Sequence, residues 1–278
     1  MYLDKILAQH REVASRDSRS LSGLIEATRT ISNSRGFAKR LIEDSKNALA
    51  VIAEIKRRSP SRGLLSHDLD PKVIAEQYKN AGASCISVLT DSDFFGGSVD
   101  DLKSARGAVD LPVLRKDFTV SLNDICDAKL MNADCILLIV AALNKGELAE
   151  FHNFASELGL DVLVEIHDEP ELDLALEIGA KMIGVNQRNL KTFEVDQQRA
   201  VRIAKKMPSG VVRVEFMPLE SREVLVSQPL LWGGSQENTE RAARAASMAM
   251  AVNTSVQVTV PRWEGGRDMA TVYSRVPL

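Results

Sequence analysis

Residues 50–63, Ala-Val-Ile-Ala-Glu-Ile-Lys-Arg-Arg-Ser-Pro-Ser-Arg-Gly, form an apolar strand-like run that carries two opposite charges and stops at a Ser-Pro-Ser turn. Side chains alternate between the faces of a strand, so Glu54 and Lys56 lie on one face and the apolar residues between them on the other. In a parallel barrel this pair would point inward near the C-terminal end of its strand, where such barrels hold their chemistry. Taken alone, the pair is more typical of a structural ion pair than of a functional site.

Length and composition are those of a globular protein with an ample core. The chain has 278 residues, of which 45% are hydrophobic and 26% charged, and its formal net charge is −3. Its length allows one α/β barrel or two small domains. The charge balance gives no general reason to expect nucleic acid or acidic membranes as partners. The charged start, residues 1–5, is not that of a signal peptide, and no apolar run is long enough to span a bilayer.

Cysteines and histidines give no sign of a metal site. Three cysteines, Cys85, Cys126 and Cys135, lie in apolar or helical segments without metal-type spacing. They are typical of buried thiols in a reducing compartment, so we expect a cytoplasmic protein. The four histidines also lack metal-binding spacing, and we expect none of them in the site; they are His10, His67, His152 and His167.

Strand-like and helix-like segments alternate from residue 50 onward. Short α/β units with continuously apolar strands imply a parallel sheet buried on both faces. Because no Gly-rich dinucleotide fingerprint accompanies the seven or eight units, we predict a (β/α)8 TIM barrel rather than a doubly wound sheet. We expect a helical extension that covers one end of the barrel (1–48), the barrel itself (49–253) and a tail of unknown structure (254–278). The predicted strands are 50–56, 85–89, 112–115, 135–140, 161–166, 182–185 and 210–214, and the predicted helices include 71–81, 122–131, 145–158 and 169–178.

Charged and polar residues follow several of the predicted strands at the same end. In a barrel these side chains converge on one mouth, and randomly placed structural ion pairs would not be confined there. A buried carboxylate or ammonium needs a partner or a function, so the set reverses the odds given by the first pair alone. The residues are Glu54, Lys56, Lys116, Glu165, Asn186 and Arg188.

Several motifs of this kind coincide in one known family. They are Ile-Ala-Glu-Ile-Lys-Arg-Arg-Ser-Pro-Ser (52–61), Phe-Gly-Gly-Ser (95–98), Leu-Arg-Lys-Asp-Phe (114–118), Leu-Leu-Ile-Val (137–140), Val-Glu-Ile-His (164–167) and Gly-Val-Asn-Gln-Arg-Asn-Leu (184–190). Over about residues 1–214 the chain resembles the indole-3-glycerol phosphate synthases of tryptophan biosynthesis. The resemblance implies a carboxy-lyase that closes 1-(2-carboxyphenylamino)-1-deoxyribulose 5-phosphate to indole-3-glycerol phosphate, with loss of carbon dioxide and water. It implies no metal and no organic cofactor.

The resemblance also implies roles for the residues at the mouth. Lys116 would be the acid that makes the sugar ketone electrophilic, and Lys56 would pair with the anthranilate carboxylate, although either lysine could be the acid of one step. Glu165 and Glu54 would supply the carboxylates for dehydration. The remaining residues that match substrate-binding positions are Ser59, Pro60, Ser61, Phe95, Phe118, Leu137, Asn186, Arg188 and Leu190. Taken singly, the apolar residues of this set would be core residues. We expect Arg57 and Arg58 to be solvated charges in the loop.

The C-terminal end departs from the family pattern, in which strand seven ends in Glu-Ser-Gly and strand eight in a Gly-containing motif followed by Ser. Here Arg222 stands where glycine would let backbone amides approach phosphate. The two candidate strand ends are too close for a crossover helix between them. Two explanations stay open: a genuine divergent end, and a reading frame shifted near residue 214, which the abrupt loss of motifs favours. The phosphate contacts expected from the remnants are Ser221, Gly233, Gly234 and Ser235.

Two other functions remain as alternatives. One is a different ribulose-phosphate barrel, such as an isomerase or a Schiff-base aldolase, which the strand-end lysines permit. The other is an inactive or weakly active remnant that binds anthranilate-like ligands or partner proteins. We expect a small phosphorylated substrate, no nucleic-acid or membrane partner, and a monomer or weak homo-oligomer, with other tryptophan-pathway enzymes as the partners to test.

Overall fold

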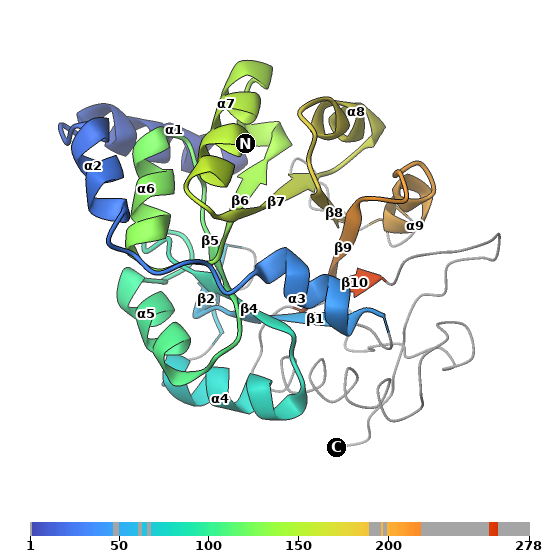
Figure 1. Ribbon diagram of the computed structural model, residues 1–278, viewed down its shortest axis with the longest axis horizontal. Coiled ribbons are helices and arrows are strands. Elements are labelled where there is room, and N and C mark those ends of the chain that lie inside the picture. The colour runs from blue at the N-terminus through green and yellow to red at the C-terminus, as the bar shows by residue number, and fades with distance from the viewer. Residues whose placement is uncertain are drawn as a thin grey trace.

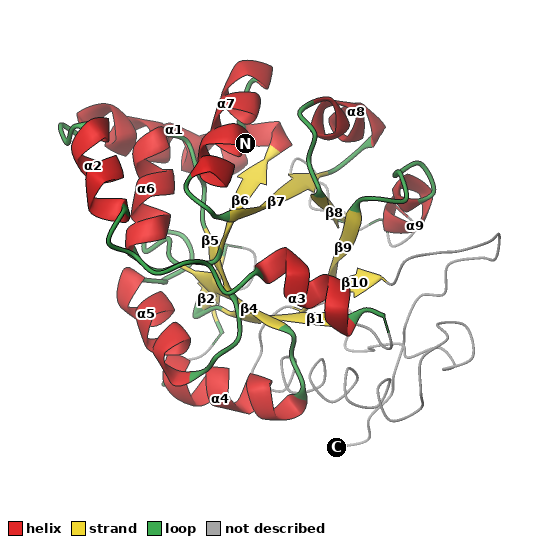
Figure 2. Ribbon diagram, in the orientation of Figure 1, coloured by secondary structure: helices red, strands yellow, loops and turns green. Residues whose placement is uncertain are grey.

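The protein is a closed barrel of eight strands surrounded by helices (Figures 1 and 2). The computed structural model describes residues 2–46, 50–60, 63–65, 68–188, 196, 199–217 and 256–260. The strands follow one another around the barrel in the order β1-β4-β5-β6-β7-β8-β9-β10. They are β1 (Ala50–Ile55), β4 (Cys85–Leu89), β5 (Val113–Lys116), β6 (Cys135–Ile139), β7 (Asp161–Ile166), β8 (Met182–Asn186), β9 (Val212–Met217) and β10 (Val256–Val260).

The outer helices begin at caps that the sequence supplies. Asp70 accepts the backbone N–H of Lys72 at the start of α4, where Pro71 is pre-set for the first helical turn, and Gly82 ends the helix with a φ of 93°. Helix α4 therefore has its predicted bounds, and the other three predicted helices end one residue earlier than expected. The outer helices are α4 (Pro71–Ala81), α5 (Val99–Ala108), α6 (Leu122–Leu130), α7 (Lys145–Glu157), α8 (Glu169–Glu177) and α9 (Arg199–Ala204), and a 3-10 turn, η1 (Val140–Ala142), follows β6.

Alternate residues of each strand divide the core into two layers. Ala50 and Ile52 of β1 pack inside the barrel against residues such as Leu114 and Leu163. Val51 and Ala53 belong to the second layer, between the strands and the outer helices. Since residues two apart share a face, Glu54 and Lys56 continue the inward-facing series of β1. The predicted barrel is thus confirmed, and its first strand points the charged pair inward.

Strand β10 closes the barrel in the opposite direction from the other seven. It pairs antiparallel with both β1 and β9, with Val256 opposite Ala53 and Met217. In a parallel eighth strand the last residue would reach the mouth, whereas here the first residue of β10 does. The expectation of an atypical last unit is confirmed. Strand β10 lies past residue 253, where the sequence placed the end of the barrel.

The N-terminal helices lie against both ends of the barrel and its outer side. In α3 (Phe37–Asp44), Phe37 and Leu41 are fully buried against the inward-facing first residues of the strands, and the helix lies next to β1 and β9 (Figure 1). Asp161, at the start of β7, accepts the backbone N–H of Ala38. Helix α2 (Leu21–Thr28) packs on α6, and α1 (Tyr2–Arg16) reaches the mouth through side chains described below. Helix α3 thus closes the end of the barrel opposite to the mouth.

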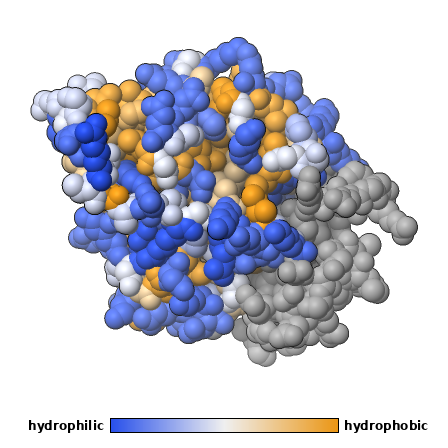
Figure 3. All heavy atoms as spheres, in the orientation of Figure 1, coloured by the Kyte–Doolittle hydropathy of each residue, from blue (hydrophilic) through white to orange (hydrophobic). Residues whose placement is uncertain are grey.

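On the face that Figure 3 shows, hydrophilic residues surround smaller hydrophobic patches. The large exposed apolar side chains come from separate elements, Val13, Ile42, Leu64 and Val73. All three cysteines are free and buried, and burial raises the pKa of Cys126 to about 11. Within the described ranges, each helix is too short or too polar to cross a bilayer.

Glu215 on β9 makes stability depend on pH. Burial raises its pKa from 4.5 to about 7, although a hydrogen bond from Gln187 opposes the shift. Between these values the folded chain binds a proton that the unfolded chain has lost, so stability falls as pH rises from 4.5 through 7. The cost above pH 7 is at most about 3 kcal/mol.

We therefore expect Glu215→Gln to gain stability relative to the unaltered chain as pH rises from 5 to 8.5. Urea unfolding of both proteins at these two pH values measures the gain. A difference in unfolding free energy that is the same at both would contradict it.

Candidate active site

Polar side chains from four strands, β1, β5, β7 and β8, lie at the mouth of the barrel. Lys56 directly follows β1, Lys116 ends β5, Glu165 lies next to the end of β7, and Asn186 ends β8. Each lies at an inward-facing position. The residue two before it, which also faces inward, is Glu54 for Lys56 and an apolar residue or a glycine for the other three. The structure thus brings the predicted strand-end residues to one end of the barrel.

The first charged pair is a buried ion pair. Lys56 Nζ lies 2.8 Å from Glu54 Oε1, and the two side chains are 11% and 5% exposed. Glu54 Oε2 lies 3.5 Å from the hydroxyl of Ser87, its partner on β4. The Tyr78 hydroxyl of α4 donates to the backbone carbonyl of Glu54. The lysine ammonium is therefore held at the mouth by a carboxylate that is itself fixed.

The second charged pair joins β5 to β7. Lys116 Nζ lies 3.7 Å from Glu165 Oε2, which is an ion-pair distance but too long for a hydrogen bond. Asn186 donates to the other oxygen, Oε1, at 3.0 Å. Among the described residues, Glu165 Oε2 has no hydrogen-bond partner, although the side chain is only 3% exposed. A buried carboxylate with one satisfied and one available oxygen is suited to accept a proton.

An aromatic ring from β9 covers the second pair. Lys116 Nζ lies 5.5 Å from the centroid of the Phe216 ring, within the range of a cation–π contact. The ring needs a glycine on the neighbouring strand, because a Cβ on Gly184 would lie 2.4 Å from Phe216 Cε2. Gly184 and Phe216 thus fit together above the lysine.

The predicted apolar walls lie in the loops and strands around these pairs. The ring centroids of Phe95 and Phe118 are 6.3 Å apart. Leu137 lies inside the barrel and is 1% exposed. The loop that holds Phe95 folds tightly onto β4, since a Cβ on Gly97 would lie 2.1 Å from the carbonyl oxygen of Leu89. This close approach explains Gly97 of the Phe-Gly-Gly-Ser motif, and Gly96 has a φ of 66°, in the left-handed region that favours glycine.

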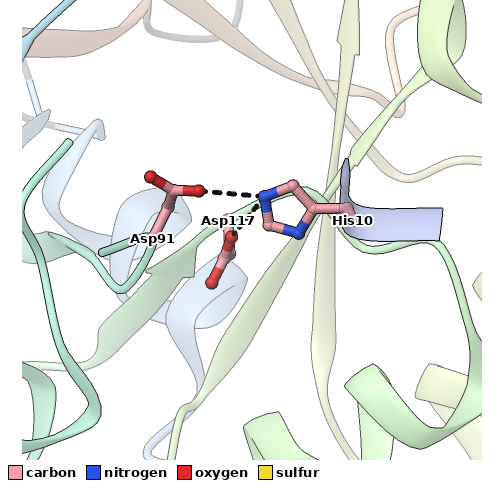
Figure 4. A group of neighbouring side chains, drawn as sticks. All are labelled: His10, Asp91 and Asp117. Carbon is pink, nitrogen blue, oxygen red and sulfur yellow. Dashed lines mark hydrogen bonds and ion pairs between the residues drawn. The ribbon is translucent and has the colours of Figure 1, made fainter. Parts of the chain in front are cut away.

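Helix α1 reaches the same loop through His10, which the sequence did not place in the site. Its Nε2 lies 2.9 Å from Asp91 Oδ2 and 3.9 Å from Asp117 Oδ1 (Figure 4). The imidazole also lies 5.3 Å from the ring of Phe118, and Asp91 accepts the backbone N–H groups of Phe94 and Phe95. The N-terminal helix is thus joined to two of the predicted wall residues.

His10, Asp91 and Asp117 offer ligand atoms within 4.8 Å of one another, a spacing that could hold a metal ion. The carboxylates already accept from backbone amides, from Thr90 and from the Arg115 guanidinium. Burial lowers the pKa of His10, but the hydrogen bond to Asp91 and the nearby carboxylates outweigh it and raise the pKa. A metal needs neutral imidazole, so the donor set fits an ion pair better than a metal centre.

In the loop after β1, Arg57 differs from what the sequence led us to expect. Arg57 is no solvated charge, because its guanidinium makes two hydrogen bonds to Asp101, at 2.8 and 2.7 Å, and one to the carbonyl of Leu69. Ser59 lies in a small hairpin of β2 (Arg58–Ser59) and β3 (Gly63–Leu64), with Pro60 at its turn. The backbone N–H of Arg58 donates to the carbonyl of Phe95. The hairpin is therefore tied to the loop that carries the aromatic wall.

Arg188 lies directly beyond β8, and its backbone N–H donates to Asn186 Oδ1 at 3.0 Å. Arg199 of α9 donates to the backbone carbonyl of Asn186. These contacts fix the asparagine that holds Glu165. The predicted site residues that lie outside the described part of the chain are Ser61, Leu190, Ser221, Gly233, Gly234 and Ser235.

The sequence also gave no role to His167. Its Nε2 lies 3.6 Å from Glu165 Oε1 and its Nδ1 lies 3.1 Å from Glu171 Oε2. A usable signal was present, because residues 165 and 167 share one face of the chain if the strand continues in extended form.

Comparisons with known proteins identify the family of this chain. A family model described as "Indole-3-glycerol phosphate synthase" matches residues 3–220. The indole-3-glycerol phosphate synthase of Chlorobium luteolum is 50% identical over 223 residues, covering 79% of this chain and 84% of that protein. The one from Bordetella pertussis is 48% identical over 212 residues, covering 75% and 80%. The family match ends close to the point at which the sequence motifs stop. The chain belongs to the indole-3-glycerol phosphate synthase family.

Proposed function

We propose that this chain converts 1-(2-carboxyphenylamino)-1-deoxyribulose 5-phosphate to indole-3-glycerol phosphate. A bond forms between the ring carbon that bears the carboxylate and the sugar carbonyl carbon, whose oxygen takes up a proton. The bond to the carboxylate then breaks, carbon dioxide leaves, and its electron pair returns to the ring. Loss of the new hydroxyl as water, with removal of one proton, completes the indole.

Lys116 is the acid of ring closure in this proposal. Its ammonium lies at the mouth between the Glu165 carboxylate and the Phe216 ring, so it can deliver a proton to the ketone oxygen. Lys56, held by Glu54 at 2.8 Å, pairs with the substrate carboxylate and places the aromatic carbon against the carbonyl. Once carbon dioxide has left, Lys56 is free to donate a proton in a later step.

Glu165 is the base of dehydration in this proposal, and Glu54 is the second carboxylate near the departing hydroxyl. The available Oε2 of Glu165 supports the first assignment. Asn186 and Arg188 hold substrate hydroxyls and developing charge. The aromatic ring of the substrate lies against apolar side chains and the loop after β1 covers it, with Phe95, Phe118, Leu137, Leu190, Ser59, Pro60 and Ser61 as the contacts.

The observation that carries the proposal is the Lys116–Glu165 pair at the mouth of a barrel that also holds Lys56 and Glu54. The test is incubation of the purified chain with the substrate while indole fluorescence and carbon dioxide are both measured. Equal amounts of the two products are expected. Borohydride that traps a lysine adduct, with no indole formed, would favour a Schiff-base aldolase instead.

The phosphate end of the site is expected to limit activity. Barrels bind phosphate through backbone amides and a helix N-terminus after strands seven and eight, and β10 runs in the opposite direction. We expect the chain to be slow and less stable than a complete barrel. Replacing residues 215–278 with a Glu-Ser-Gly strand end, a crossover helix and a parallel strand that ends in Gly-Ser should raise both properties.

A side-by-side measurement of product formation and thermal unfolding tests this expectation. The matched control is a chain with residues 215–278 replaced by the same new segment in which the glycine of Glu-Ser-Gly is changed to arginine. Full activity of the unaltered chain, with micromolar affinity for substrate, would show that its own end builds a working phosphate site.

The proposal also includes the cellular location, the oligomeric state and the protein partners. The enzyme would work in the cytoplasm on a small phosphorylated substrate, as a monomer or weak homo-oligomer. Other enzymes of tryptophan biosynthesis are the protein partners to test. Sedimentation of the purified chain over a range of concentrations would measure its oligomeric state.

A further inference from the structure

Three consecutive residues of α1 bind the segments that follow three neighbouring strands. Gln9 donates to Asp93 in the loop after β4. His10 lies between the carboxylates at the ends of β4 and β5 (Figure 4). Arg11 makes two hydrogen bonds to Glu147 of α7, beyond β6, at 2.8 and 3.0 Å. Helix α1 is therefore fastened to the rim of the mouth, and His10 makes the middle one of the three contacts.

The two oxygens of Asp91 have different partners. Oδ1 accepts the backbone N–H groups of Phe94 and Phe95, at 2.6 and 3.0 Å, and so holds the loop that carries the Phe95 ring. Oδ2 lies 2.9 Å from Nε2 of His10. The Asp91 side chain is only 4% exposed, so its charge is poorly solvated and needs a cation. His10 thus acts on the loop through the carboxylate that folds it.

Asp117 holds the second wall residue in the same way. Its Oδ1 accepts the backbone N–H of Phe118 at 2.9 Å and lies 3.9 Å from Nε2 of His10. Its Oδ2 accepts from Thr90 and from the Arg115 guanidinium. The imidazole also packs on Phe118, with the ring centroids 5.3 Å apart. One nitrogen of His10 therefore faces both carboxylates, and each carboxylate fixes the backbone of one wall phenylalanine.

The charged groups around His10 favour its protonated form. Burial lowers the pKa of His10, but the hydrogen bond and charge of Asp91 and the charge of Asp117 outweigh it and raise the pKa. Asp124 of α6 adds to the rise, whereas Arg115 of β5 pairs with Asp117. The imidazolium is fully present below the ordinary value of 6.5 and is lost as pH rises through the raised pKa. Neutral imidazole can still donate to Asp91, but it no longer attracts both carboxylates.

We propose that His10 is a positioning residue that sets the spacing of Phe95 and Phe118, whose ring centroids are 6.3 Å apart, and thereby the fit of the substrate's aromatic ring. When protonated, it draws Asp91 and Asp117 together and holds both phenylalanine backbones in place. When neutral, it holds Asp91 alone, and the second loop is less constrained. The inference rests on the proposed function, which assigns these two rings to the apolar wall. Helix α1 then builds part of the site and does not only cover the barrel.

The test uses anthranilate as the probe, because its fluorescence measures binding without turnover. The dissociation constant is determined for the unaltered chain and for His10→Gln between pH 6 and pH 9, while NMR follows the His10 imidazole. Glutamine can still donate to Asp91 but carries no charge. The constant of His10→Gln should therefore be ~5-fold or more above that of the unaltered chain at pH 6, and equal to it at pH 9. The midpoint of this change should match the His10 pKa that NMR gives.

Arg11→Ala separates positioning by His10 from docking of the helix. It removes the contact between α1 and Glu147, so it should lower thermal stability. Its dissociation constant for anthranilate should stay close to that of the unaltered chain at every pH. In the reaction, His10→Gln should raise KM at pH 6 by the same factor as the dissociation constant and leave kcat nearly unchanged. Arg16→Ala, on the exposed end of α1, is the control that should change none of these quantities.

Two results would show that His10 only docks the helix. One is a ratio of the His10→Gln constant to that of the unaltered chain that is the same at every pH, and the other is an equally raised constant in Arg11→Ala. Absence of anthranilate binding by the unaltered chain would also overturn the inference. If anthranilate binding follows His10 as expected but no indole-3-glycerol phosphate forms, the proposed function fails and the positioning of the two rings stands. If product forms while the ratio stays constant, the proposed function stands and this inference fails.

Discussion

Lys116→Ala is expected to lower kcat by ~100-fold or more while KM changes little. The ammonium is the acid that the ketone oxygen needs, and the structure holds it 3.7 Å from Glu165 and 5.5 Å from the Phe216 ring centroid, at the mouth of the barrel. Its removal costs the transition state more than the bound substrate. Steady-state rates of indole formation, followed by fluorescence at several substrate concentrations, measure both constants.

Lys116→Met is a second variant to be assayed with Lys116→Ala, because methionine keeps most of the side-chain volume without the charge. The matched control is Lys145→Ala, which removes an exposed lysine that pairs with Glu177 on the outer surface. A turnover number that stays the same while KM rises would show that Lys116 only binds substrate. The control should keep both constants of the unaltered chain.

Glu165→Gln is expected to separate ring closure from dehydration. Glutamine keeps the shape and the oxygen that accepts from Asn186, but it cannot take up the proton that leaves with water. Loss of a general base typically lowers the rate by ~10² to 10⁴. An intermediate in which the new ring has closed but the hydroxyl has not yet left should therefore accumulate. Rapid-quench sampling followed by mass spectrometry detects it.

Glu157→Gln, on the exposed side of α7, is the control for this exchange. It makes the same chemical change away from the mouth and should accumulate nothing. Intact activity in Glu165→Gln, with no intermediate at any sampled time, would rule out Glu165 as the base.

Local signals made much of this fold predictable. The alternation of charged and apolar residues along β1 placed Glu54 and Lys56 on the inward face, and the structure agrees. Helix α4 has an N-cap, a first-turn proline and a terminal glycine in sequence, so its bounds followed from residues within the helix and at its ends. Such features depend on neighbours along the chain, which the sequence displays directly.

Features that depend on distant partners were not predictable in the same way. The direction of β10 depends on pairing with β1 and β9, and its own five residues, Val-Gln-Val-Thr-Val, do not encode it. Arg57, in the loop after β1, was expected in solvent because its partner, Asp101, lies far along the chain on α5. His10 likewise meets Asp91 only after α1 has docked at the mouth. Only His167 could have been singled out by its spacing from Glu165.

The most direct test measures the release of carbon dioxide and of indole-3-glycerol phosphate together, in single turnovers of three proteins. The unaltered chain should release both, slowly but in equal amounts. Glu165→Gln should release carbon dioxide without a matching amount of indole, and Lys116→Ala should release neither on the same time scale. Equal release of both products by all three proteins, or no release by the unaltered chain, would contradict the assignment of an acid and a base to this barrel mouth.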